Sequence, residues 1–145
     1  MKKVPGSEEE MYRCAEEFLR DMGTKSSDGA TVIALYGELG SGKTVFVRGI
    51  ARALGIKDSV QSPTFVLERI YEIENHPQFR KLIHIDSYRM DHPDELRDLG
   101  WSELIADAKN LVCIEWAERV EDLLPPETRK VYCAFIDENK RDIHW

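Results

Sequence analysis

The sequence predicts an α/β fold, with a mixed, mostly parallel sheet flanked by helices. Two observations lead to this prediction. Apolar runs rich in β-branched residues alternate along the chain with amphipathic helical patterns, as in proteins built from βαβ units. A glycine-rich stretch stands between one such run and one such helix, at residues 37–44. The length of 145 residues is typical of one domain, so residues 1–145 are expected to fold as a single unit.

The first half of the chain reads as helix, strand and helix. Ser7 precedes three glutamates, which is typical of a helix N-cap with acidic residues in the first turn, and Gly23 is expected to end this helix. Residues 31–36 form an apolar run suited to a strand covered on both faces. A second helix is expected over residues 43–54, closed by Gly55.

The second half contains further candidate strands separated by short helices. Residues 64–73 and 81–86 are predicted strands joined by a turn, so they are expected to be antiparallel neighbours. The remaining expected elements are a helix starting at 91–95, a helix over 101–108, a buried strand over 110–115, a short helix over 118–124 stopped by Pro125-Pro126, and strands over 131–136 and 143–145.

The stretch at residues 37–44 matches the phosphate-binding P-loop pattern G-x-x-x-x-G-K-[ST]. Its glycines permit backbone angles that let successive N–H groups point into one concavity, and the helix behind adds positive potential. The lysine of this pattern reaches the β- and γ-phosphates, and its threonine hydroxyl can ligate Mg²⁺. The sequence therefore predicts a P-loop NTPase with nucleotide-binding residues Gly37, Leu39, Gly40, Ser41, Gly42, Lys43 and Thr44.

Two predicted strands end in an acidic residue, Asp86 and Glu115. Ligands of open α/β sheets bind beyond the carboxyl ends of the strands, so either acid can point at the phosphates. Residues 62–64 form a loop about 20 residues after the P-loop, where a hydroxyl can sense the γ-phosphate, although a plain turn into a strand is the better explanation of these residues taken alone. The indole of Trp116 is expected either to cover the nucleotide pocket or to pack in the core, and His84 is expected to be a core residue.

Composition excludes several classes of protein. The formal net charge is −7, which argues against non-specific nucleic-acid binding, and no direct sequence-specific contact with nucleic acid is expected. No apolar run approaches the roughly 18 residues that span a bilayer, and no apolar signal segment follows Met1, so no membrane association is expected. The three cysteines lack metal-ligand spacing and are expected to be buried, inert thiols, which favours a reducing, cytoplasmic location.

Taken in order, four motifs resemble the TsaE family, the small bacterial ATPases required for threonylcarbamoyladenosine (t⁶A) modification of tRNA. The motifs are the P-loop, Ser62-Pro63-Thr64-Phe65, His84-Ile85-Asp86-Ser87-Tyr88-Arg89 and Ile114-Glu115-Trp116-Ala117-Glu118. The resemblance implies ATP and Mg²⁺ as cofactors, with Thr44 and Glu115 holding the metal. It also implies that Asp86 is essential for hydrolysis together with Lys43, that Thr64 lies on a switch-like loop, and that Arg141 borders the nucleotide.

The same resemblance implies partners. Members of the TsaE family act with a TsaD–TsaB pair that transfers the threonylcarbamoyl group to adenosine 37 of tRNA, so tRNA would be met only through that complex. Three alternatives stay open. A small-molecule P-loop kinase would need an acceptor site and an arginine-bearing lid, to which Arg89 and Arg97 could contribute. A GTPase-like switch is suggested by Asn139-Lys140-Arg141-Asp142, although only three residues follow this pattern. A nucleotide-dependent binding module with negligible turnover of its own is the third.

Overall fold

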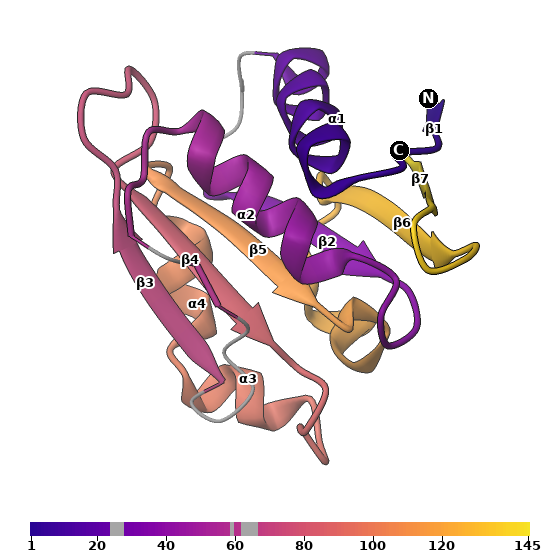
Figure 1. Cartoon of the computed structure of the whole chain (residues 1–145). Helices are drawn as coiled ribbons and strands as arrows, with labels where there is room; N and C mark the ends of the chain where they lie inside the picture. Colours follow the sequence, from indigo (N-terminus) through magenta and orange to yellow (C-terminus); the bar gives the residue numbers. More distant parts are fainter. Residues whose placement is uncertain (24–27, 59, 62–66) are drawn as a thin grey trace.

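The computed structural model describes residues 1–23, 28–58, 60–61 and 67–145. Within these residues the chain forms one seven-stranded sheet with helices on both faces (Figure 1). The strands are β1 (Lys2–Lys3), β2 (Thr31–Tyr36), β3 (Glu68–Glu72), β4 (Lys81–Asp86), β5 (Asn110–Glu115), β6 (Arg129–Phe135) and β7 (Arg141–His144). The helices are α1 (Glu8–Met22), α2 (Lys43–Ala53), α3 (Asp94–Asp98), α4 (Trp101–Ala106) and the 3-10 helix η1 (Ala117–Leu123).

The sheet has a parallel centre and antiparallel edges. Its strand order is β1-β7-β6-β2-β5-β4-β3, and the pairs β6–β2, β2–β5 and β5–β4 are parallel. The pairs β1–β7, β7–β6 and β4–β3 are antiparallel, as expected for the neighbours β3 and β4. The parallel register places Asp86 directly opposite Glu115. The two acidic residues that end separate strands therefore lie side by side at the carboxyl ends of the parallel strands.

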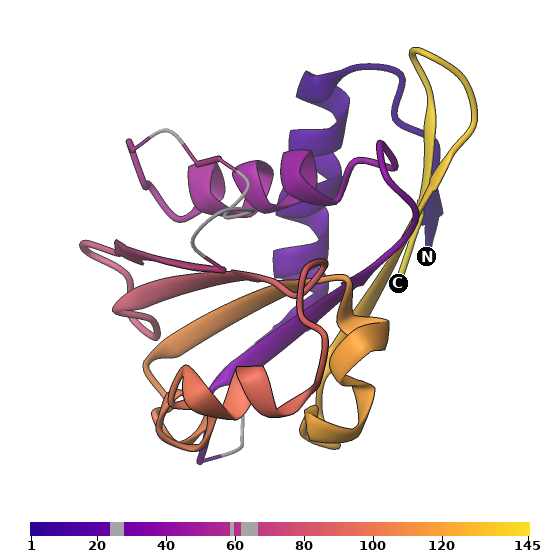
Figure 2. The same ribbon diagram turned by 90° about the horizontal axis from the view of Figure 1, so that it is seen from below.

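Two hydrophobic cores cover the two faces of the sheet, which Figure 2 shows between the helical layers. Successive side chains of a strand point to opposite faces, so the apolar run of β2 supplies both cores. Ile33 and Leu35 pack in the core beneath α1 and α2, whereas Val32 and Ala34 pack in the core that contains residues of α3, α4 and η1. A strand buried on both faces is what a continuous apolar run predicts.

Helix α1 begins and ends where its sequence predicts. The Ser7 hydroxyl accepts a hydrogen bond from the Glu10 backbone N–H at 3.1 Å, and Gly23 ends the helix with a φ of 65°. Met11 and Phe18 are buried on its inner face, which packs against α2. This packing fixes the N-terminal end of α1 beside the loop that precedes α2, as Figure 1 also shows.

Some boundaries differ from the expectation. In place of the helix expected over residues 118–124, the chain forms the 3-10 helix Ala117–Leu123, which it enters through Trp116 at a φ of 57° and whose helical backbone is broken at Val120. Strand β3 begins at Glu68, while residues 64–66 of the predicted strand lie outside the described part of the chain. The edge strand β1 was not predicted, because two lysines carry no strand pattern and the strand forms only by pairing with β7.

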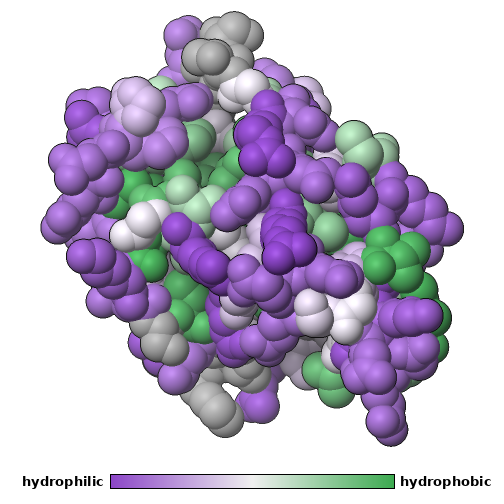
Figure 3. Space-filling model, turned by 45° about the horizontal axis from the view of Figure 1, so that its top comes forward, coloured by the Kyte–Doolittle hydropathy of each residue, from purple (hydrophilic) through white to green (hydrophobic). Residues whose placement is uncertain are grey.

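The cysteines are buried, as the sequence predicts. All three cysteines, Cys14, Cys113 and Cys133, are buried and free, and burial raises the pKa of each thiol. The face in Figure 3 is mostly hydrophilic, with hydrophobic side chains in separate groups. Among the described residues there is no helix with the length and hydropathy needed to cross a membrane. Exposed apolar residues of this scattered kind are ordinary on a protein surface.

Candidate functional site

The P-loop connects the carboxyl end of β2 to the first turn of α2. Three of its glycines have positive φ angles: 143° at Gly37, 78° at Gly40 and 101° at Gly42. Gly42 is the N-cap of α2, so the free backbone N–H groups at the start of this 11-residue helix face the loop. A glycine-rich turn followed by a helix N-terminus is a binding site for phosphate groups.

Gly37 lacks room for any side chain. A Cβ atom here would lie 2.2 Å from the Cys133 carbonyl oxygen and 2.6 Å from the Ser41 Oγ. Gly37→Ala should therefore lower the free energy of unfolding by about 1–3 kcal/mol and weaken nucleotide binding, because the loop must shift. Urea unfolding measures the first effect. Gly23→Ala is the matched control, since Gly23 also has a positive φ but its added Cβ meets nothing within 4 Å; equal losses in the two variants would contradict the steric explanation.

Lys43 is the buried cation of the site. Its Nζ donates to the carbonyl oxygens of Gly37 and Glu38, the latter at 2.9 Å, and lies 3.4 Å from the Ser41 Oγ. The ammonium also lies 4.0 Å from the centre of the Trp116 ring, within range of a cation–π interaction. Burial lowers the pKa of Lys43, while the charge of Glu115 opposes that shift. A desolvated ammonium held at the loop is suited to interact with phosphate oxygens.

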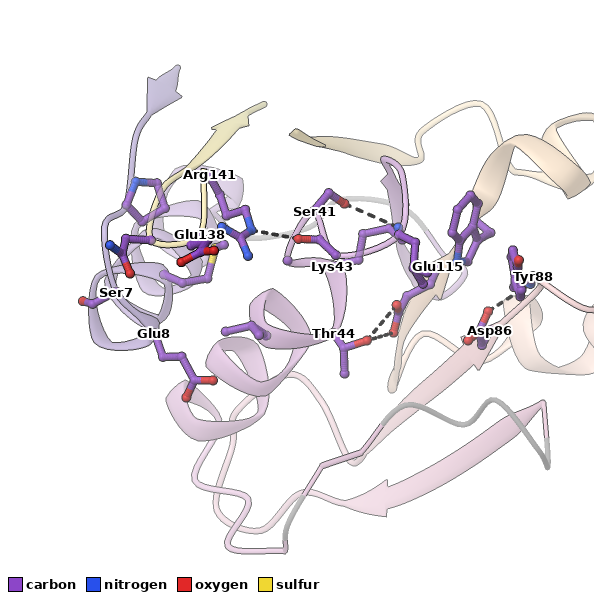
Figure 4. Close-up of a pocket in the computed structure, with 18 of the residues that line it drawn as sticks. Ser7, Glu8, Ser41, Lys43, Thr44, Asp86, Tyr88, Glu115, Glu138 and Arg141 are labelled. Carbon is purple, nitrogen blue, oxygen red and sulfur yellow. Dashed lines mark hydrogen bonds between the residues drawn. The ribbon is translucent and has the colours of Figure 1, made fainter. Parts of the chain in front are cut away.

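Thr44, Glu115 and Asp86 bring oxygen donors together beside the loop. The Thr44 hydroxyl lies 2.9 Å and 3.1 Å from the two carboxylate oxygens of Glu115. The Asp86 Oδ1 accepts a hydrogen bond from the Tyr88 backbone N–H at 2.9 Å. Both carboxylates are buried, with exposed fractions of 5% for Asp86 and 3% for Glu115. Figure 4 shows Thr44 and Glu115 facing each other between Lys43 and Asp86.

These residues fit a Mg²⁺ ion that is shared with a nucleotide. Magnesium prefers oxygen ligands and is usually held by one or two carboxylates together with substrate phosphates and water. Thr44 and Glu115 supply a hydroxyl and a carboxylate at hydrogen-bond distance from each other. No group of three or more histidine, cysteine, aspartate or glutamate side chains suited to a metal occurs in the part of the chain that the structure describes. One hydroxyl and one carboxylate leave the other coordination positions of such a metal to phosphate oxygens and water.

A cavity of about 790 Å³ extends away from the P-loop. At one end lie Lys43, Thr44, Asp86 and Glu115, and at the other lie Ser7, Glu8 and Glu138 (Figure 4). This volume is in the range of small-molecule and cofactor sites. The cavity has room for a nucleotide whose phosphates would lie at the end with Lys43 and Thr44.

Arg141 and Trp116 lie on the wall of this cavity. The Arg141 Nε donates to the Gly40 carbonyl oxygen at 2.8 Å, so β7 supports the P-loop backbone. Trp116 adopts a left-handed backbone conformation, and its ring lies 4.8 Å from that of Tyr88. Both side chains line the cavity. The alternative that Trp116 packs wholly within the core is not what the structure has.

The structure gathers most of the predicted site residues around one cavity. Those lining it are Leu39, Gly40, Ser41, Gly42, Lys43, Thr44, Asp86, Glu115, Trp116 and Arg141, while Gly37 contacts Lys43 from below the loop. Thr64 lies outside the described residues. His84 is buried, as expected of a core residue, but its contact with Glu115 was not predicted. The available signal was its spacing, because a residue two positions before Asp86 on a strand shares its face of the sheet.

The fold and the loop define a protein of the P-loop class. Comparisons with known proteins agree. The family described as "Threonylcarbamoyl adenosine biosynthesis protein TsaE" matches residues 6–143. The tRNA threonylcarbamoyladenosine biosynthesis protein TsaE of Aquifex aeolicus is 38% identical over 139 residues, covering 94% of this chain and 89% of the relative.

A further relative and a solved structure agree with this match. The protein of the same name from Bacillus subtilis is 38% identical over 112 residues, covering 77% of this chain and 66% of the relative. The crystal structure of YdiB from Bacillus subtilis superposes with a TM-score of 0.73 at 29% identity, covering 99% of this chain and 82% of that chain. The chain belongs to the TsaE family.

Proposed function

We propose that this protein is a Mg²⁺-dependent ATP hydrolase that acts in t⁶A modification of tRNA at adenosine 37, together with a TsaD–TsaB transferase complex. The observation that carries the proposal is the convergence of Lys43, Thr44, Glu115 and Asp86 on one cavity at the carboxyl ends of β2, β4 and β5. Membership of the TsaE family supports the role in t⁶A synthesis, since the relatives are named for it.

Different groups in the cavity bind the phosphates and the metal ion. The backbone N–H groups of the P-loop and the start of α2 face the phosphates, where the helix terminus favours negative charge. Lys43 donates to the β- and γ-phosphate oxygens and offsets their charge. Thr44 and Glu115 would hold Mg²⁺, which neutralises the charge that develops on the transferred phosphoryl group.

Asp86 is the candidate for orienting the attacking water. It lies opposite Glu115 in the β4–β5 register, so its carboxylate is at the metal end of the cavity. The hydrogen bond from the Tyr88 N–H to Oδ1 fixes the direction of this carboxylate. A buried carboxylate in that place can accept a hydrogen bond from water and, later, its proton.

Adenine is the proposed base rather than guanine, because the aspartate of the guanine-reading pattern is not among the described residues that line the cavity. The aspartate of the guanine-reading pattern is Asp142, and its carboxylate pairs with the Lys2 ammonium at 3.1 Å. Asp142 is in β7, whose pairing with β1 engages it in that ion pair. Competition between ATP and GTP for the protein tests this assignment, and tighter binding of GTP would overturn it.

The role in tRNA modification is tested by reconstitution. We expect ATP hydrolysis to be slow with this protein alone and to rise several-fold when the TsaD–TsaB pair and tRNA are added, because in the proposed function hydrolysis is coupled to that complex. The measurements are phosphate release and t⁶A content of the tRNA, each with and without this chain. Transfer of labelled γ-phosphate to a metabolite would instead indicate a kinase. Intact nucleotide binding with no response to the partners would contradict the t⁶A assignment.

A further inference from the structure

His84 is a polar side chain enclosed completely within the sheet layer next to the nucleotide cavity. It lies on β4 two residues before Asp86, and its exposed fraction is 0%. Its face of the sheet is the one covered by α1 and α2, because Cys113, its register partner on β5, belongs to that core. Glu115 lies two residues beyond Cys113, so both side chains point toward the same layer.

The imidazole makes one direct polar contact with the site. Its Nε2 contacts the Glu115 Oε2 within hydrogen-bond distance. An ionised carboxylate has acceptors only, so the hydrogen must be on Nε2 and the histidine donates it. The Nδ1 atom has no hydrogen-bond partner among the described residues.

Burial of the His84 imidazole is unfavourable unless its contact with Glu115 offsets the loss of hydration. Burying a polar nitrogen without a partner is unfavourable by about 1–3 kcal/mol, and an apolar side chain would fill the same space without this cost. The Glu115 carboxylate is itself nearly fully buried and faces Lys43 and Thr44. A second donor is what such a carboxylate needs in order to keep a single orientation.

We propose that His84 is a positioning residue for the nucleotide-bound Mg²⁺, acting through Glu115; this proposal rests on the nucleotide-binding function proposed above. The His84 hydrogen bond is made to Oε2, while the Thr44 hydroxyl lies 2.9 Å from Oε1 and 3.1 Å from Oε2. Because His84 contacts Oε2 and not Oε1, Oε1 is the carboxylate oxygen left to join the Thr44 Oγ1 as a pair of oxygen donors for the metal. Direct ligation by His84 is disfavoured because magnesium prefers oxygen and the ring is behind Glu115, not in the cavity lining.

Binding of Mn²⁺ in the presence of ADP tests this role without any turnover. The free ion has an electron paramagnetic resonance signal that is lost on binding, so titration gives the metal affinity of the protein–ADP complex. His84→Leu should weaken Mn²⁺ binding by about 10- to 100-fold, the usual effect of losing a residue that orients a metal ligand. The affinity for ADP measured in EDTA, without metal, should change by less than about threefold in the same variant. The substitution leaves the P-loop unchanged.

Two matched variants separate positioning from packing. His84→Gln places an N–H donor about as far from the backbone as His Nε2 and should restore most of the Mn²⁺ affinity. Leu82→Ala opens space in the same strand, on the same face, two residues away, and should lower the melting temperature while leaving Mn²⁺ affinity unchanged. If His84→Leu shows no cooperative unfolding transition, His84→Asn replaces it, because its donor is one bond too short to reach Glu115.

Specific results would overturn the proposal. The proposal is wrong if a folded His84→Leu or His84→Asn protein binds Mn²⁺ as tightly as the unaltered protein. It is also wrong if His84→Leu, His84→Gln and Leu82→Ala all lose Mn²⁺ affinity equally, since that result would indicate an effect of packing alone. Failure of the unaltered protein to bind ADP with Mn²⁺ would instead contradict the proposed nucleotide function, so the two failures are distinguishable.

Discussion

Lys43→Ala is expected to abolish productive nucleotide binding, lowering the affinity for ATP by about 100-fold or more. The ammonium can donate two charge-assisted hydrogen bonds to phosphate oxygens, each worth about 1.5–3 kcal/mol, and 3 kcal/mol already corresponds to more than about 100-fold. The effect is large because Lys43 is buried: an ammonium removed from water is screened less than one on the surface. Isothermal titration with ATP, with and without Mg²⁺, measures the loss.

The control for this variant is Lys57→Ala. Lys57 is an exposed lysine just beyond α2, so its removal changes the net charge equally but leaves the P-loop intact. We expect ATP affinity to be unchanged within about twofold in this variant, as for an exposed charge at a distance. An undiminished affinity in a folded Lys43→Ala protein would show that the loop binds phosphate through its backbone alone.

Local signals in the sequence predicted the elements that carry the site. The runs at residues 31–36, 81–86 and 110–115 match β2, β4 and β5 residue for residue, because strands buried on both faces leave a continuous apolar signal. The P-loop was equally clear, since its glycine spacing is dictated by backbone angles. Thr44 lies beside Glu115 because α2 begins directly over the ends of these strands.

What escaped prediction depends on register between distant segments. The contact between His84 and Glu115 exists because β4 and β5 pair in parallel with Asp86 opposite Glu115, and no pattern within either strand specifies that alignment. The hydrogen bond from Arg141 to the P-loop likewise requires β7 to lie close to the end of β2. A histidine in an apolar run reads as a core residue until the carboxylate on the next strand is placed beside it.

Substitution of Asp86 is expected to have the second large effect, because Asp86 and Glu115 have different proposed roles. Asp86→Asn is expected to lower kcat for ATP hydrolysis by about 100-fold or more, in the range seen when a general base is removed. The affinity for ATP should change by less than about threefold, because Lys43, Thr44 and Glu115 still bind phosphates and metal. The asparagine Oδ1 can still accept the hydrogen bond from the Tyr88 N–H, so the local backbone should be retained.

Single-turnover hydrolysis and equilibrium binding distinguish this role from a structural one. Asp91→Asn removes an exposed carboxylate five residues further along and should leave both quantities unchanged. A loss of binding as large as the loss of turnover in Asp86→Asn would make Asp86 a metal ligand rather than the residue that orients water. Hydrolysis at the unaltered rate would remove it from the reaction altogether. Since Asp86 and Glu115 are register partners with nearly equal burial, only their different neighbours can separate their roles: Thr44 and His84 contact Glu115, whereas the Tyr88 backbone orients Asp86.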